Sequence, residues 1–174
     1  MVQMVILRPT RKLQKSLPPA GNGDAVSETA LGDWYVNRLV VDRRPLLLLV
    51  SSRSLLPILI PAREVRSLPK RLADLVGARL NRMEIADHLI ARETQAMSPV
   101  LVRKTSDRSV LGILVDFAKS IPYYLEVGIW DENALPLVED LLAKTPCYAG
   151  RRFEEVVFPD RKTSELLAER WHAG

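Results

Sequence analysis

The chain has 174 residues, of which 47% are hydrophobic and 26% charged, and its formal net charge at pH 7 is +4. This balance is that of an ordinary globular protein and excludes a fibrous or disordered chain. The length fits a single domain spanning 1–174. The small positive charge permits an acidic partner without demanding one, because charge governs association more than fold.

The cysteine content and the apolar runs bear on where the protein resides. Cys147 is the only cysteine, which rules out an intramolecular disulfide and favours a reducing compartment. Residues 1–9 lack the basic region, long apolar run and cleavage site of a secretory signal. The longest apolar run, 46–50, is far too short to cross a bilayer. We therefore expect a cytoplasmic protein without a membrane partner.

The first third of the chain favours strands. An apolar run at 2–7 predicts a first strand, and 10–17 predicts a short helix. Aromatic and β-branched residues then predict three strands joined by short turns as an antiparallel meander, at 34–41, 46–50 and 55–60.

Two of these strands have predictable places in the sheet. The 46–50 run shows no alternation of apolar and polar residues, so both its faces should be covered and the strand should be central. Pro57 lies within the third strand of the meander. Because proline cannot donate to a β-ladder, that strand should lie at an edge or carry a bulge.

Helical periodicity dominates the rest of the chain. Five segments have apolar residues at helical spacing, at 68–83, 84–97, 109–120, 133–144 and 161–172. Shorter apolar segments predict further strands, at 100–102, 123–130 and 153–158. The sequence therefore predicts an α+β fold, with a small antiparallel sheet packed against several helices.

The sequence lacks the motifs that announce most enzymes. It has neither a glycine-rich phosphate loop nor a G-x-S-x-G nucleophile elbow. One cysteine and two distant histidines, His88 and His172, cannot form a zinc pattern. The acidic residues Glu139 and Asp140 are interpreted as solvated charges on a helix face. These observations favour a non-enzymatic protein, with no cofactor and no metal.

The first candidate site is the start of the 109–120 helix and its polar stripe. Apolar residues occupy most of this helix, which indicates burial, and one narrow polar stripe should face solvent, a partner or a cleft. Gly112 in this stripe would permit close approach of a backbone or a ligand. The candidate binding residues are Lys104, Thr105, Arg108, Ser109 and Asp116.

Two interpretations of this helix start remain open. In one, Thr105 or Ser106 caps the helix and Gly112 allows tight packing against a strand. In the other, Lys104, Arg108 and the helix N-terminus converge on a phosphate or a carboxylate.

Two further groups of residues are candidates for binding. Trp34, Asn37 and Arg38 lie on a predicted strand, where Asn37 is a polar side chain among apolar neighbours. Its side-chain amide either forms hydrogen bonds to a loop or to the sheet edge, or contacts a substrate or a partner. The second group is a candidate basic patch for nucleic acid, although no aromatic residues are interleaved with it. Its members are Arg8, Arg11, Lys12, Lys70, Arg71, Arg79 and Arg82.

Two stretches carry a resemblance to a known family. Residues 31–37, with the sequence LGDWYVN, contain a W-x-x-N motif, and residues 104–112 are KTSDRSVLG. Together they resemble a family of short bacterial proteins classed as a domain of unknown function, over about 10–160. At 113–115 this chain has Ile-Leu-Val, where the family has a more polar run containing an asparagine. The resemblance implies a bacterial origin and brings no activity, cofactor or catalytic residue.

Three functions are consistent with the sequence. The first is a non-catalytic binding or accessory protein of a bacterial system, which recognises a protein or a nucleic acid. The second is an enzyme acting on a phosphorylated or carboxylated small molecule at the Lys104–Arg108 helix start. The third is a self-associating structural protein, a homo-oligomer that pairs through the Pro57 strand or the 109–119 stripe.

Overall fold

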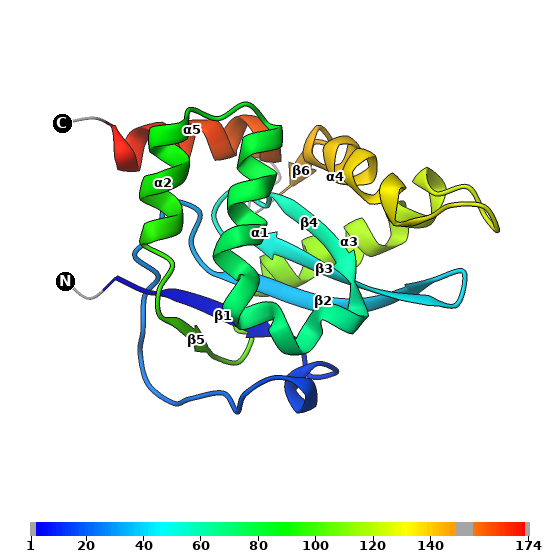
Figure 1. Cartoon of the computed structure of the whole chain (residues 1–174), viewed down its shortest axis with the longest axis horizontal. Helices are drawn as coiled ribbons and strands as arrows, with labels where there is room; N and C mark the ends of the chain where they lie inside the picture. The colour runs from blue at the N-terminus through cyan, green and yellow to red at the C-terminus, as the bar shows by residue number, and fades with distance from the viewer. Residues whose placement is uncertain (1–2, 149–154, 173–174) are drawn as a thin grey trace.

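The computed structural model of the chain describes residues 3–148 and 155–172 (Figure 1). Over these residues it contains a five-stranded mixed sheet, a two-stranded sheet and five α-helices, so the fold is α+β. The strand order of the main sheet is β4-β3-β2-β1-β5. Among the helices so described, none is long and apolar enough to cross a membrane.

The predicted meander is confirmed. It consists of β2 (Trp34–Val41), β3 (Arg44–Ser51) and β4 (Pro57–Pro61), each antiparallel to the next. Asp42 and Arg43 both have positive φ, as a two-residue hairpin turn requires. Both expectations about strand position hold: β3 is an internal strand buried on both faces, and β4 lies at the edge of the sheet.

The remaining two strands make the sheet mixed instead of wholly antiparallel. β1 (Val5–Pro9) runs parallel to β2, and β5 (Val100–Val102) runs parallel to β1 at the second edge. Val5, Ile6 and Leu7 are completely buried, so β1 is an internal strand with both faces covered. The small sheet pairs β6 (Cys147–Tyr148) with β7 (Val156–Val157).

Helices cover both faces of the main sheet (Figure 1). One core holds α1 (Leu68–Arg82), α2 (Asp87–Gln95) and α5 (Pro159–Trp171) against one face of the sheet. A second core holds α3 (Arg108–Tyr124) and α4 (Leu135–Ala143) against the other. Alternate side chains of each strand enter different cores: Trp34 and Val36 enter the first, and Tyr35 enters the second.

Four predicted elements differ from the structure. The 10–17 helix is reduced to a single 3-10 turn at Gln14–Ser16, and the 84–97 helix begins only at Asp87. The predicted strand at 123–130 is wrong, because α3 continues to Tyr124. Phe117 and Ile121 are four residues apart and both buried in the second core, which is a helical spacing. The predicted strand at 153–158 shrinks to β7, and 153–154 lie outside the described residues.

Candidate functional site

The first candidate site lies where two parallel strands end. Because β1 and β5 run in the same direction, the segments after Pro9 and after Val102 leave the sheet on the same side. α3 begins a few residues after β5 ends, at Arg108. The carboxyl ends of parallel strands are common positions for ligands. Lys104 and Arg108 are exposed there, and Thr105 is half-buried.

The start of α3 is capped by its own chain. Asp107, and not Thr105 or Ser106, is the N-cap: its carboxylate accepts hydrogen bonds from Ser109 N at 2.8 Å and Val110 N at 3.3 Å. The hydroxyl of Tyr35 accepts a hydrogen bond from Asp107 N at 3.0 Å. Three of the N–H groups that would bind an anion are therefore already used.

The polar stripe of α3 faces solvent. All four of its residues are exposed, as the periodicity predicts for a single solvent-exposed side of the helix. They are Ser109, Gly112, Asp116 and Lys119. Near its middle, the Asp116 carboxylate lies beside a hollow of about 110 Å³ that Cys147 also lines. Burial, assisted by Asp116, raises the pKa of the Cys147 thiol to about 11, so the thiol stays protonated and weakly nucleophilic at neutral pH.

Gly112 has no packing role inside the chain. A Cβ built on this residue meets nothing within 4 Å, so the close approach to a strand expected from the sequence is wrong. We predict that Gly112→Ala stabilises the protein by about 1 kcal/mol, because alanine has the higher helix propensity. Chemical denaturation would measure this gain, and a loss of stability would show that the position needs glycine for another reason.

Asn37 and the segment after β1 form a hollow with α3. Thr10 N donates to Val36 O at 2.9 Å, and the Thr10 hydroxyl donates to Asn37 Oδ1 at 2.7 Å. Asn37 Oδ1 also accepts from Arg38 N at 2.9 Å, so both of these bonds use the oxygen of the amide. The resulting hollow of about 260 Å³ is lined by Thr10, Arg11, Lys12, Asn37, Leu111, Leu114 and Val115.

The other two residues of the Asn37 group have different positions. Trp34 is completely buried in the first core, away from the molecular surface. Arg38 is exposed on β2, next to Asn37 in the sequence and opposite Leu47 of β3. The structure therefore brings Asn37, but not Trp34, to the hollow beside α3.

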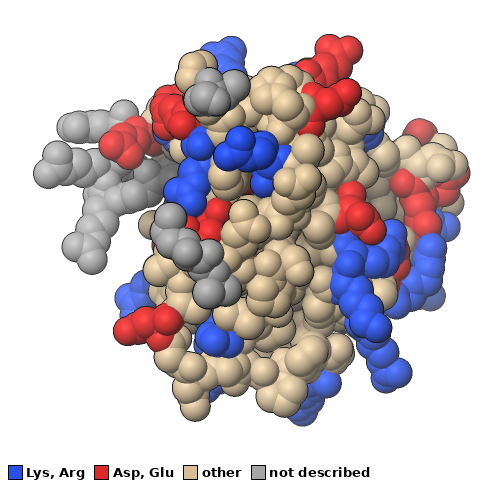
Figure 2. Space-filling view, turned by 60° about the vertical axis from the view of Figure 1, so that its left-hand side comes forward, with Lys and Arg blue, Asp and Glu red and all other residues tan. Residues whose placement is uncertain are grey.

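The residues of the candidate basic patch do not gather on one surface. Arg8 pairs with Asp33 at 2.6 Å, and Arg71 pairs with Glu64. Arg11 and Lys12 line the hollow beside α3, whereas Lys70 is exposed on α1. On the face drawn in Figure 2, Lys and Arg side chains stand in separate groups, with acidic side chains beside several of them. This arrangement provides no continuous track for a phosphate backbone on that face.

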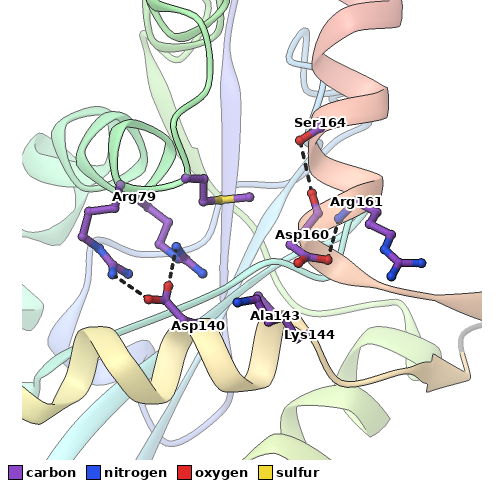
Figure 3. A pocket seen from close by; sticks show the side chains of 9 residues that line it. Arg79, Asp140, Ala143, Lys144, Asp160, Arg161 and Ser164 are labelled. Carbon is purple, nitrogen blue, oxygen red and sulfur yellow. Dashed lines mark hydrogen bonds and ion pairs between the residues drawn. The ribbon is translucent and has the colours of Figure 1, made fainter.

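The last two members of that set, Arg79 and Arg82, lie in a pocket between α1, α4 and α5 (Figure 3). Arg79, a member of the candidate basic patch, is not a surface cation, because it is only 3% exposed. Asp140 of α4 pairs with both arginines, with Arg79 Nη1 at 3.1 Å and Arg82 Nη1 at 3.2 Å. The pocket has a volume of about 330 Å³, and α5 forms its far wall (Figure 3).

Glu139 lies beneath these residues and corrects a second expectation. It was expected to be a solvated charge but is 6% exposed. Its carboxylate accepts hydrogen bonds from Leu59 N of β4 and from Arg82 Nη2, both at 2.7 Å. Burial raises the pKa of Glu139 and lowers the pKa of Arg79, and the opposite charges of the group counteract both shifts.

The sequence contains one signal for this pocket, which is the position of Arg79 in the helix. The apolar residues predicted to form the buried side of the 68–83 helix did not include Arg79. Leu72, Val76 and Arg79 follow one another at helical spacing on the buried side of α1, so Arg79 occupies a core position. A charged residue at such a position requires a buried partner. The partner carboxylates come from α4, about 60 residues later in the chain, and periodicity alone does not reveal that contact.

Comparison with known proteins decides the family. The model of a domain of unknown function, DUF6933, matches residues 6–162. The chain belongs to the DUF6933 family. The matched part of this DUF6933 protein includes all five strands of the main sheet except Val5, together with α1 to α4 and the first residues of α5. No curated protein and no solved structure gives a significant match.

Proposed function

We propose that this DUF6933 protein is a non-catalytic binding protein of the bacterial cytoplasm, an accessory factor that recognises a protein partner. The observation that carries the proposal is the hollow beside α3, which brings together two groups of candidate residues and one side of α3. The candidates are Asn37 and the Arg11–Lys12 pair, and the side of α3 is the one that carries Leu111 and Val115.

The chemistry of the hollow suits an acidic segment of a protein that carries an apolar side chain. Leu111 and Val115 offer partly exposed apolar surface, and Val115 is 49% exposed. Arg11 and Lys12 are exposed at the rim and would attract carboxylates. A nucleic acid is less well suited, because basic groups stand apart on the face drawn in Figure 2 and no stacking aromatic residue lines the hollow.

Gly112 supports the same surface. It leaves open space one helical turn before Val115, at the expense of helix propensity. Nothing within 4 Å of its added Cβ explains the glycine from inside the chain. A partner that approaches the α3 backbone closely would explain it.

Site-specific photo-crosslinking in the source cells would test the proposal. A photoreactive amino acid replaces Val115 in one variant and Ala78, an exposed residue of α1 on the opposite face, in the control. We expect one protein to crosslink at Val115 and not at Ala78, and Gly112→Ala should reduce its yield. Equal labelling at both positions, or crosslinks to nucleic acid, would contradict the proposal.

A further inference from the structure

The pocket between α1, α4 and α5 has a small excess of positive charge, even when the buried Glu139 carboxylate bound to Arg82 is counted. Its lining residues include four cationic side chains and two carboxylates (Figure 3), the cations being Arg79, Arg82, Lys144 and Arg161. Asp140 and Asp160 are the acids. Its volume of about 330 Å³ lies within the range of pockets that hold small ligands.

In this pocket Arg79 Nη1 has an ion-pair partner, Asp140, but no hydrogen bond within the described residues. The Nη1 atom is buried, and although Asp140 Oδ1 lies 3.1 Å away, the N–H bonds do not align with that oxygen. The remaining donors make only long bonds, Nε to Pro57 O at 3.3 Å and Nη2 to Glu139 O at 3.4 Å. A buried charged donor left in this state is costly, so the site lacks a well-placed acceptor.

The far wall adds one cation, Arg161, and one carboxylate, Asp160. The Asp160 Oδ1 atom accepts a hydrogen bond from Arg161 N at 2.7 Å, in the first turn of α5. The Arg161 guanidinium stacks over the ring of Phe158, 4.6 Å from its centre. Lys144 is exposed at the mouth, at the end of α4, and has no ion pair in the part of the chain that is described.

We propose that this pocket binds a small phosphorylated ligand. One phosphate oxygen accepts the free N–H of Arg79 Nη1, and Arg82 and Lys144 balance the remaining charge. A phosphate supplies several acceptor oxygens and up to two negative charges, which matches a site with three converging cations better than a single carboxylate does. Asp140 competes with the phosphate for both arginines, and it is 42% exposed, so it can move aside.

Binding of inorganic pyrophosphate, measured by calorimetry at low ionic strength, tests this assignment. The wild-type protein should bind it at one saturable site. Lys144→Ala should weaken binding roughly tenfold, which corresponds to one charge-assisted contact. Asp140→Asn should tighten binding by a similar factor, because the competing charge is gone. Lys70→Ala removes an exposed lysine of α1 outside the pocket and should leave the affinity unchanged.

Three results would overturn the proposal. The first is the absence of saturable binding by a folded wild-type protein. The second is an equal loss of affinity in Lys70→Ala and Lys144→Ala, which indicates non-specific attraction. The third is citrate binding as tightly as pyrophosphate, which would assign the pocket to carboxylates. All of these outcomes are independent of the α3 surface, because Val115 is not part of the pocket.

Discussion

Replacing Glu93 with alanine is expected to lower the free energy of unfolding by on the order of 4 kcal/mol. The side chain is completely buried on α2, where its carboxylate accepts three hydrogen bonds. The donors are Ala30 N at 2.7 Å, Leu31 N at 3.1 Å and Trp171 Nε1 at 2.8 Å. Each donor left unsatisfied in the core costs about 1–3 kcal/mol.

The effect should be large because Glu93 joins three distant parts of the chain. It connects α2 to the segment before β2 and to the last turn of α5. Burial raises the pKa of Glu93, and the three hydrogen bonds oppose that shift. The guanidinium groups of Arg92 and Arg170 lie over the Trp171 ring and help to hold it in place.

Urea denaturation and limited proteolysis would check this prediction together. Glu169→Ala is the matched control, since Glu169 is an exposed helical glutamate on α5 and its loss should change stability little. In Glu93→Ala, proteases should cut α5 before the rest of the chain, because that helix loses its hydrogen bond to the core. Similar stabilities for the two variants would show that Glu93 is not what holds α5.

The elements that were predicted correctly are those whose signal lies in residues that are close together in the sequence. Aromatic and β-branched residues locate β2 to β4, and the uninterrupted apolar run at 46–50 identifies an internal strand. The parallel pairing of β1 was not predictable in this way, because Val5 pairs with Val100. The strand predicted at 123–130 failed because aromatic residues suit a strand as well as the end of a largely buried helix.

The candidate sites show the same limit: contacts between residues that are distant in the sequence could not be predicted. The polar stripe of α3 was predictable from its period, and the structure exposes it. The partner of Asn37 is Thr10, 27 residues earlier, so their contact needs the sheet to exist. Glu93 and Glu139 gave no signal as buried residues, because their backbone partners lie 62 to 80 residues away along the chain. A buried carboxylate is recognised only once its donors are placed.

The edge of the sheet at β4 is closed by side chains, which bears on self-association through this strand. Exposed edge strands offer free backbone groups to other chains. Here Glu139 accepts the Leu59 N–H at 2.7 Å, and Arg79 Nε donates to Pro57 O at 3.3 Å. The two prolines of β4, Pro57 and Pro61, carry no N–H at all. Pairing of this edge with a second copy would therefore require Glu139 to leave.

Glu139→Ala should lower the free energy of unfolding by about 3–5 kcal/mol, the usual effect of removing one partner from a buried ion pair. The loss leaves Leu59 N and Arg82 Nη2 without their acceptor, and it removes a carboxylate whose charge offsets that of the buried Arg79. Glu132→Ala is the matched control, since that carboxylate pairs with Arg63 at an exposed site and should not shift the denaturation midpoint. Because the variant also uncovers the β4 edge, its folded form should associate at high concentration, which light scattering detects. A variant as stable and as monomeric as the control would show that neither the edge nor Arg79 depends on Glu139.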